Sequence, residues 1–137
     1  MELDRELEHV ASAAAAFAAG GEEVAAVVAA EPSPDRRTYL CAFDGPGGRT
    51  WLALDAHGAP VTSRDRVREA ISIATVCEVA EEAGGDVENV VRVASPAYLD
   101  RLGEQHGSSV AAVLGDAAAA ADELARELEA QYKLPLT

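Results

Sequence analysis

Two short β-prone runs on either side of a loop of Gly and Pro constrain this chain more than any other feature. Residues 38–43 and 50–54 are rich in aromatic and aliphatic side chains, and the loop at 44–49 holds three glycines and a proline. Such a pattern predicts a β-hairpin. If Phe43 pairs with Thr50, successive side chains alternate between the two faces of the hairpin, and both faces are then apolar.

Both faces of this predicted hairpin need a cover. One face carries the larger set of apolar side chains, namely Tyr39, Cys41, Phe43, Leu52 and Leu54, and the other carries Leu40, Ala42, Trp51 and Ala53. A second apolar face must be covered by another helix or by a second copy of the chain. We expect a homodimer whose interface holds Trp51, Leu40, Ala42 and Ala53. Trp51, the only tryptophan, is its expected hot spot, and burial under a helix of the same chain is the alternative for this residue.

Heptad spacing dominates residues 3–30. Apolar or small residues recur there at alternating gaps of four and three, from Leu3 to Val28, with Gly21 on the same seam. The pattern predicts either one long helix with a close contact at Gly21 or two helices with a kink at that point. Pro32 and Pro34 are expected to end the helix.

Helical signals return after the hairpin. Thr62 or Ser63 is expected to cap a helix over about 64–83, which the next two glycines end. Ser95 and the following proline begin a short helix that ends near residue 103. Heptad spacing predicts a last helix from residue 109 to about residue 132.

These elements predict one α+β domain over residues 1–137 that is mostly helical. Long N- and C-terminal helices pack with the central β-hairpin and with the middle helix, and residues 86–94, which are rich in valine, form a third strand or a short helix, of which we favour the strand. About thirty residues are alanine and only 4% are aromatic. Alanine buries little area, so the helices must approach closely or the chain must bury surface against a partner.

The charge of the chain excludes several classes of partner. Its formal net charge is −13, which repels phosphate backbones and anionic lipid headgroups, so we expect no nucleic-acid and no membrane partner. No apolar run approaches the roughly 20 residues that a membrane span needs. The N-terminus is charged from its second residue, unlike a secretory signal, and we therefore expect a cytoplasmic protein.

Two glutamates break the amphipathic pattern of the predicted helix over 64–83. Glu81 falls on the centre line of its apolar stripe and Glu78 on the border, whereas Thr75 falls on the opposite, polar side. Glu78, Glu81 and Glu82 are crowded at the helix C-terminus, where the macrodipole disfavours negative charge. A cation would relieve this conflict, either a divalent metal ion or the side chain of Arg92 or Arg101.

The glutamates of this stretch also follow the spacing of a known sequence signature. Glu69 is followed by seven residues and then by the run Cys-Glu-Val-Ala-Glu-Glu-Ala-Gly at 77–84. This resembles the signature of the Nudix hydrolases, which cleave nucleoside diphosphates linked to another group, except that Ser63 stands in place of its first glycine and Cys77 in place of its arginine. The resemblance implies that Glu78, Glu81 and Glu82 bind a divalent metal ion.

We favour a non-enzymatic interaction, regulatory or accessory protein that acts as a homodimer. The three histidines lack the spacing of metal ligands, and no serine lies in a Gly-x-Ser-x-Gly motif. The alternative is a metal-dependent hydrolase or a metal-binding protein that uses the Glu78, Glu81 and Glu82 cluster, with its degenerate Nudix-like box.

Overall fold

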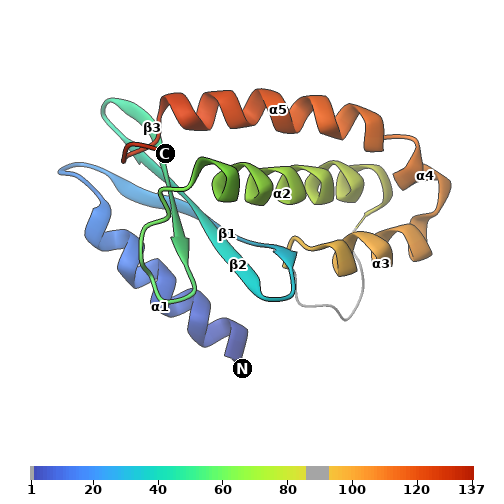
Figure 1. The fold of residues 1–137 in the computed structure, drawn as a ribbon, viewed down its shortest axis with the longest axis horizontal. Coiled ribbons are helices and arrows are strands. Elements are labelled where there is room, and N and C mark those ends of the chain that lie inside the picture. Colours follow the sequence, from blue (N-terminus) through green and yellow to red (C-terminus); the bar gives the residue numbers. More distant parts are fainter. Residues whose placement is uncertain (1, 86–92) are drawn as a thin grey trace.

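The computed structural model describes residues 2–85 and 93–137 of the chain. Its elements are α1 (Glu2–Phe17), β1 (Glu23–Ser33), β2 (Arg36–Gly45), β3 (Gly48–Asp55), α2 (Arg64–Gly84), α3 (Pro96–His106), α4 (Ser108–Ala111) and α5 (Leu114–Ala130). The three strands form an antiparallel sheet in the order β1-β2-β3. Helix α1 covers one face, α2 lies against the other, and α5 runs back beside α2 (Figure 1). The prediction of a mostly helical α+β fold is confirmed.

The β2–β3 hairpin has the predicted register. Phe43 pairs with Thr50, and the pairing continues outward to Gly45 and Gly48. The face that carries Tyr39 and its neighbours is buried against Val10 and Ala14 of α1. Alternation along the two strands was therefore sufficient to sort the side chains between the two faces.

The second half of the helix predicted over residues 3–30 is wrong, because β1 occupies it. Gly21 adopts a φ of 84° between α1 and β1, a conformation open to glycine. An irregularity in the β1–β2 pairing at Ala25 then puts Val24 and Val27 on the same face of the sheet. This three-residue spacing imitates a helix, since a bulge adds a residue to the two-residue period of a strand.

Of the prolines expected to end that helix, Pro32 lies near the end of β1 and Pro34 lies in the turn between β1 and β2. Ser33 pairs with Arg36 across the two residues Pro34 and Asp35. The Ser33 hydroxyl donates a hydrogen bond to Asp35 Oδ1 at 2.9 Å. A turn signal between two β-prone runs was present in the sequence, but the heptad spacing upstream concealed the first run.

The predicted helix starts are confirmed at two serines. Ser63 Oγ accepts from the Arg66 amide at 3.3 Å, and Ser95 Oγ accepts from the Tyr98 amide at 3.1 Å. The short helix α3 continues past residue 103, and the predicted C-terminal helix is divided into α4 and α5. Most of the strand or helix expected at 86–94 lies outside the described residues, whereas Ala94 forms a parallel bridge to Ala30 at the edge of β1.

The segment after α5 covers the outer edge of β3. The Trp51 amide donates to the Gln131 carbonyl at 3.0 Å, and the Lys133 amide donates to the Trp51 carbonyl at 2.9 Å. The Tyr132 hydroxyl donates to the Val61 carbonyl at 2.5 Å and accepts from the Ala53 amide at 2.8 Å. Burial raises the pKa of Tyr132 to about 12, so its hydroxyl keeps the proton that it donates.

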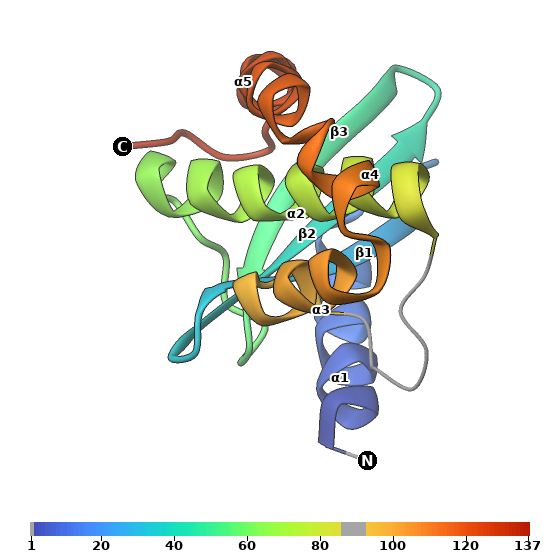
Figure 2. The same ribbon diagram turned by 90° about the vertical axis from the view of Figure 1, so that its right-hand side faces the viewer.

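Helices α3 and α4 pack beside the C-terminal half of α2, with α3 below α2 in the view of Figure 2. Tyr98 and Leu102 of α3 pack with Val110 of α4 and with Cys77 and Ala80 of α2. None of the helices within the described residues combines the length and the apolar character that crossing a bilayer requires.

Candidate functional site

A groove of about 430 Å³ lies between the second face of the sheet, α2 and α5. The sheet and both helices contribute lining residues: Val28, Leu40 and Trp51 from the sheet, Leu124 and Leu128 from α5, and Ile71, Ala74, Thr75, Glu78, Glu81 and Glu82 from α2. This volume falls within the usual range of ligand pockets, about 300–1,000 Å³. The structure thus brings together two sets of residues that the sequence suggested separately, the Trp51 face and the glutamate cluster.

The four predicted interface residues differ in their exposure. Leu40 is 5% exposed, and Ala42 and Ala53 are fully buried within the single chain. Leu40 and Ala53 pack in a core with Val67 and Ile71 of α2. Trp51 is only partly buried and lines the groove. Of the four, Trp51 is therefore the residue that offers appreciable surface to another molecule.

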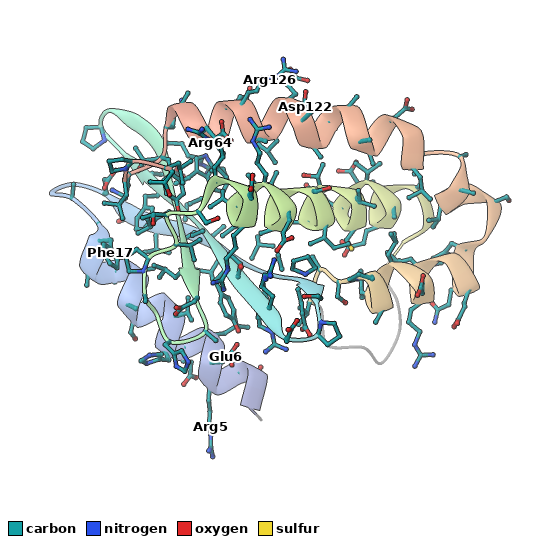
Figure 3. All side chains as sticks on the ribbon, in the orientation of Figure 1. Arg5, Glu6, Phe17, Arg64, Asp122 and Arg126 are labelled. Atoms are coloured by element: carbon teal, nitrogen blue, oxygen red, sulfur yellow. The ribbon has the colours of Figure 1, made fainter. Side chains whose placement is uncertain are left out.

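The groove exists because small side chains hold the helices together above this face. The buried residues of α5 are three alanines and Leu128, so α5 approaches α2 closely. Arg126 forms an ion pair with Asp122 on the outer side of α5 (Figure 3), whereas Glu129 reaches α2 and pairs with Arg68 at 2.6 Å. Alanines hold neighbouring helices close but do not extend far enough to fill the space down to the sheet.

The α2 wall changes in character along its length. Its lining residues follow helical spacing from Ile71 to Glu82, which at 1.5 Å per residue is about 16 Å. The wall is apolar at Ile71 and acidic at Glu78 and Glu82, both of which are exposed. Within the part of the chain that the structure describes, neither of these two glutamates forms an ion pair.

Two arginines were expected to neutralise the glutamates. Arg101 instead lies 3.8 Å from the carboxylate of Glu104 on its own helix. Arg92 lies outside the described residues. At the other end of the groove, the guanidinium of Arg49 lies 5.8 Å from the centre of the Trp51 ring and pairs with Asp44 at 2.8 Å.

Thr75 is a groove residue that the sequence pattern missed. The amphipathic pattern placed it on the polar, solvent-facing side of the helix, but the residue is only 6% exposed and lines the groove. Its Oγ1 atom is buried without a hydrogen-bond partner among the described residues. An unpaired buried hydroxyl costs about 1–3 kcal/mol, and most buried polar groups in native proteins are paired. Its spacing from Ile71 and Glu78, four and three residues, was the available signal.

The glutamates are not arranged as the Nudix-like spacing implies. Over residues 2–85 and 93–137, no group of three His, Cys, Asp or Glu side chains is placed to hold a metal ion. Glu69 pairs with Arg36 at 2.5 Å and is separated from Glu78 by nine residues of α2, about 13 Å along the helix. A metal site at Glu78, Glu81 and Glu82 stays a prediction that this geometry does not favour.

Comparison with known proteins assigns no function to the groove. The sequence matches no known family model, and neither the curated proteins nor the solved structures give a match. The groove is therefore interpreted from its own residues.

Proposed function

We propose that the protein is a non-enzymatic interaction protein and that its groove binds a segment of another protein chain. The observation that carries this proposal is the position of Trp51, a partly buried aromatic residue that lines the groove together with aliphatic side chains of the sheet, α2 and α5. Aromatic residues at the centre of a concave surface are typical binding hot spots. Hydrogen bonds to residues 131 and 133 fix the backbone at Trp51, so binding there requires no ordering of the main chain.

The chemistry of the lining favours binding over catalysis. The titratable side chains that line the groove are three glutamates, and no histidine, cysteine or lysine of the described residues joins them. A nucleophile beside a base, the usual arrangement for covalent catalysis, is not formed by these side chains. A metal-dependent hydrolase would use a metal-bound water instead, and among the described residues no group of three His, Cys, Asp or Glu supports a metal site, so this function is the less supported of the two.

The homodimer expected from the sequence stays a prediction. Because Leu40, Ala42 and Ala53 are buried within the chain, a second copy would have to use Trp51 and the groove walls in place of the whole sheet face. Light scattering over a range of protein concentrations tests this form of the proposal. A dimer that Trp51→Ala converts to a monomer supports it, and an unchanged mass for this variant removes Trp51 from the interface. The cytoplasmic location also stays a prediction.

Site-specific photo-crosslinking in the native host tests the proposal as a whole. A photoreactive amino acid replaces Ala74, which lines the groove, or Ser12, an exposed residue of α1 on the far side of the sheet. We expect a discrete cross-linked protein from position 74 and not from position 12, and its loss when Trp51→Ala is added. Equal products from the two positions would overturn the proposal. A product of twice the chain mass would identify the partner as a second copy.

A further inference from the structure

Building on this interaction function, we propose that the partner segment is a short basic peptide. Its apolar residues lie over Trp51 and Leu124, and an arginine or lysine side chain reaches the acidic end of the groove at Glu78 and Glu82. The hydroxyl of Thr75 accepts a hydrogen bond from the same cationic side chain. Three independent features of the groove support this assignment: its charge, its unpaired hydroxyl and its length.

The negative charge of the groove favours a cationic ligand. Glu78 and Glu82 are four residues apart in the last turns of α2, where like charges repel each other and the helix macrodipole disfavours negative charge. Helix α2 has no basic residue in its last turn to offset them. The chain carries a formal charge of −13, so its field attracts a basic segment and repels an acidic one.

The unpaired hydroxyl of Thr75 favours a ligand that carries a hydrogen-bonding group beside its positive charge. Thr75 lies one helical turn before Glu78 on the same wall, and its buried Oγ1 has no partner within the described residues. Carboxylates only accept hydrogen bonds, and a hydroxyl accepts as well as donates. A guanidinium carries five N–H donors in a planar fork, so one arginine side chain can serve both the hydroxyl and a carboxylate.

The length of the groove favours a peptide over a small amine. The α2 wall extends about 16 Å, which corresponds to about five residues of an extended chain at 3.3 Å each. A small cation at Glu78 and Glu82 would leave the partly buried Trp51 and Leu124 uncovered. A peptide with apolar residues before its basic residue covers both ends.

Fluorescence of the single tryptophan gives a direct binding measurement. The probes are a blocked peptide of alternating leucine and alanine that ends in arginine, the same peptide with glutamine or glutamate in place of arginine, and butylguanidinium as a small cation. Each probe is titrated into the full-length protein up to millimolar concentration, and calorimetry repeats the titrations independently of fluorescence. We expect the arginine peptide to bind at least about tenfold more tightly than the glutamine peptide, and the glutamate peptide to bind most weakly.

Two groove variants and one matched control assign the effect to named residues. Glu78→Gln combined with Glu82→Gln should weaken the arginine peptide by about tenfold and leave the glutamine peptide unchanged. Thr75→Val, which keeps the shape of the side chain, should weaken it by about threefold. The control combines Asp4→Asn with Glu8→Gln, two exposed residues of α1 on the other side of the sheet. It changes the net charge equally and should leave binding within about twofold.

The outcomes separate this inference from the function on which it rests. Equal binding of the arginine and glutamine peptides overturns the basic peptide and leaves a binding groove. Butylguanidinium that binds as tightly as the arginine peptide identifies a small cation as the occupant and overturns the peptide. Equal weakening by the control variant shows unspecific charge attraction, which overturns the proposed site. If no probe binds but position 74 cross-links to a partner, the interaction function stands and the basic peptide is wrong.

Discussion

Towards α1 the sheet presents Tyr39, Phe43 and Leu54, all fully buried; towards α2 and α5 it presents Leu40, Ala53 and a partly buried Trp51. The two faces belong to the same three strands, yet one is closed and the other retains a groove of about 430 Å³. The difference follows from the distribution of large side chains. The α1 face holds two of the few aromatic residues at full burial, whereas the opposite face is covered by aliphatic side chains and alanines of α2 and α5.

The chain has few large apolar residues, and the two faces use them differently: one face contributes to stability and the other to binding. The closed face buries the most area per residue and should contribute most to the free energy of unfolding. The grooved face gives up part of that contribution and keeps a concave apolar surface with an acidic end. We therefore expect substitutions on the two faces to differ in kind, with effects on stability at the α1 face and effects on binding at the groove.

The largest expected effect comes from removing an aromatic side chain from each face. Phe43→Ala should lower the free energy of unfolding by about 3–5 kcal/mol, because it leaves a cavity in a fully buried core. Trp51→Ala should cost less than half as much, because the ring already borders an open groove. Urea unfolding measures the free energy of unfolding of both variants. It is followed by circular dichroism, because Trp51→Ala contains no tryptophan whose fluorescence could report unfolding. Equal losses would contradict the difference between the two faces.

A smaller effect that differs between the two faces is expected from enlarging an alanine. Ala14→Leu on the closed face should lower stability by about 1–3 kcal/mol, since a fully buried methyl group leaves no room for a larger side chain. Ala74→Leu, which extends into the groove, should change stability by less than about 1 kcal/mol. Thermal unfolding measures the stability of both variants. An equal loss of stability in Ala74→Leu would contradict an open groove at this position.

The smallest expected effect is a pH dependence from Glu22, whose partner Lys133 lies against Phe43 of the closed face. Lys133 Nζ donates to Glu22 Oε1 at 2.5 Å and lies 4.6 Å from the centre of the Phe43 ring. This bond, followed by those from the Ala19 amide and the Thr50 hydroxyl, lowers the pKa of Glu22 from 4.5 to about 2. The stabilisation is therefore complete above about pH 4.5, where Glu22 is ionised in both the folded and the unfolded state.

As the pH falls towards 2, the unfolded chain takes up the proton on Glu22 first, so the stabilisation is progressively lost. Urea midpoints at pH 7, 4 and 3 should therefore decrease more for the unmodified protein than for Glu22→Gln. Glu8→Gln, a substitution of an exposed carboxylate on α1, is the control and should keep the pH dependence of the unmodified protein. An equal pH dependence in the Glu22 variant would show that this ion pair does not contribute to stability.

Local rules determined much of the fold from the sequence alone. The hairpin register, the division of its side chains between two faces and the serine caps of α2 and α3 follow from residues within a few positions of each other. Turn formation, strand alternation and helix capping act over this short range, and each rule names the residue types that it needs. For the same reason, Trp51 and the three glutamates were already recognisable as exceptions to the expected patterns.

Only the tertiary structure decided what β1 and the groove are. A helical seam would put Val24 and Val28 on one side, whereas in β1 they lie on opposite faces of the sheet. Pairing with β2, which no local pattern within residues 3–30 encodes, selects the strand. The groove depends on how closely the alanines of α5 approach α2. It also depends on the rotation of α2, which puts Thr75 in the wall of the groove. Such positions result from packing between segments far apart in the chain, so neither periodicity nor spacing encodes them locally.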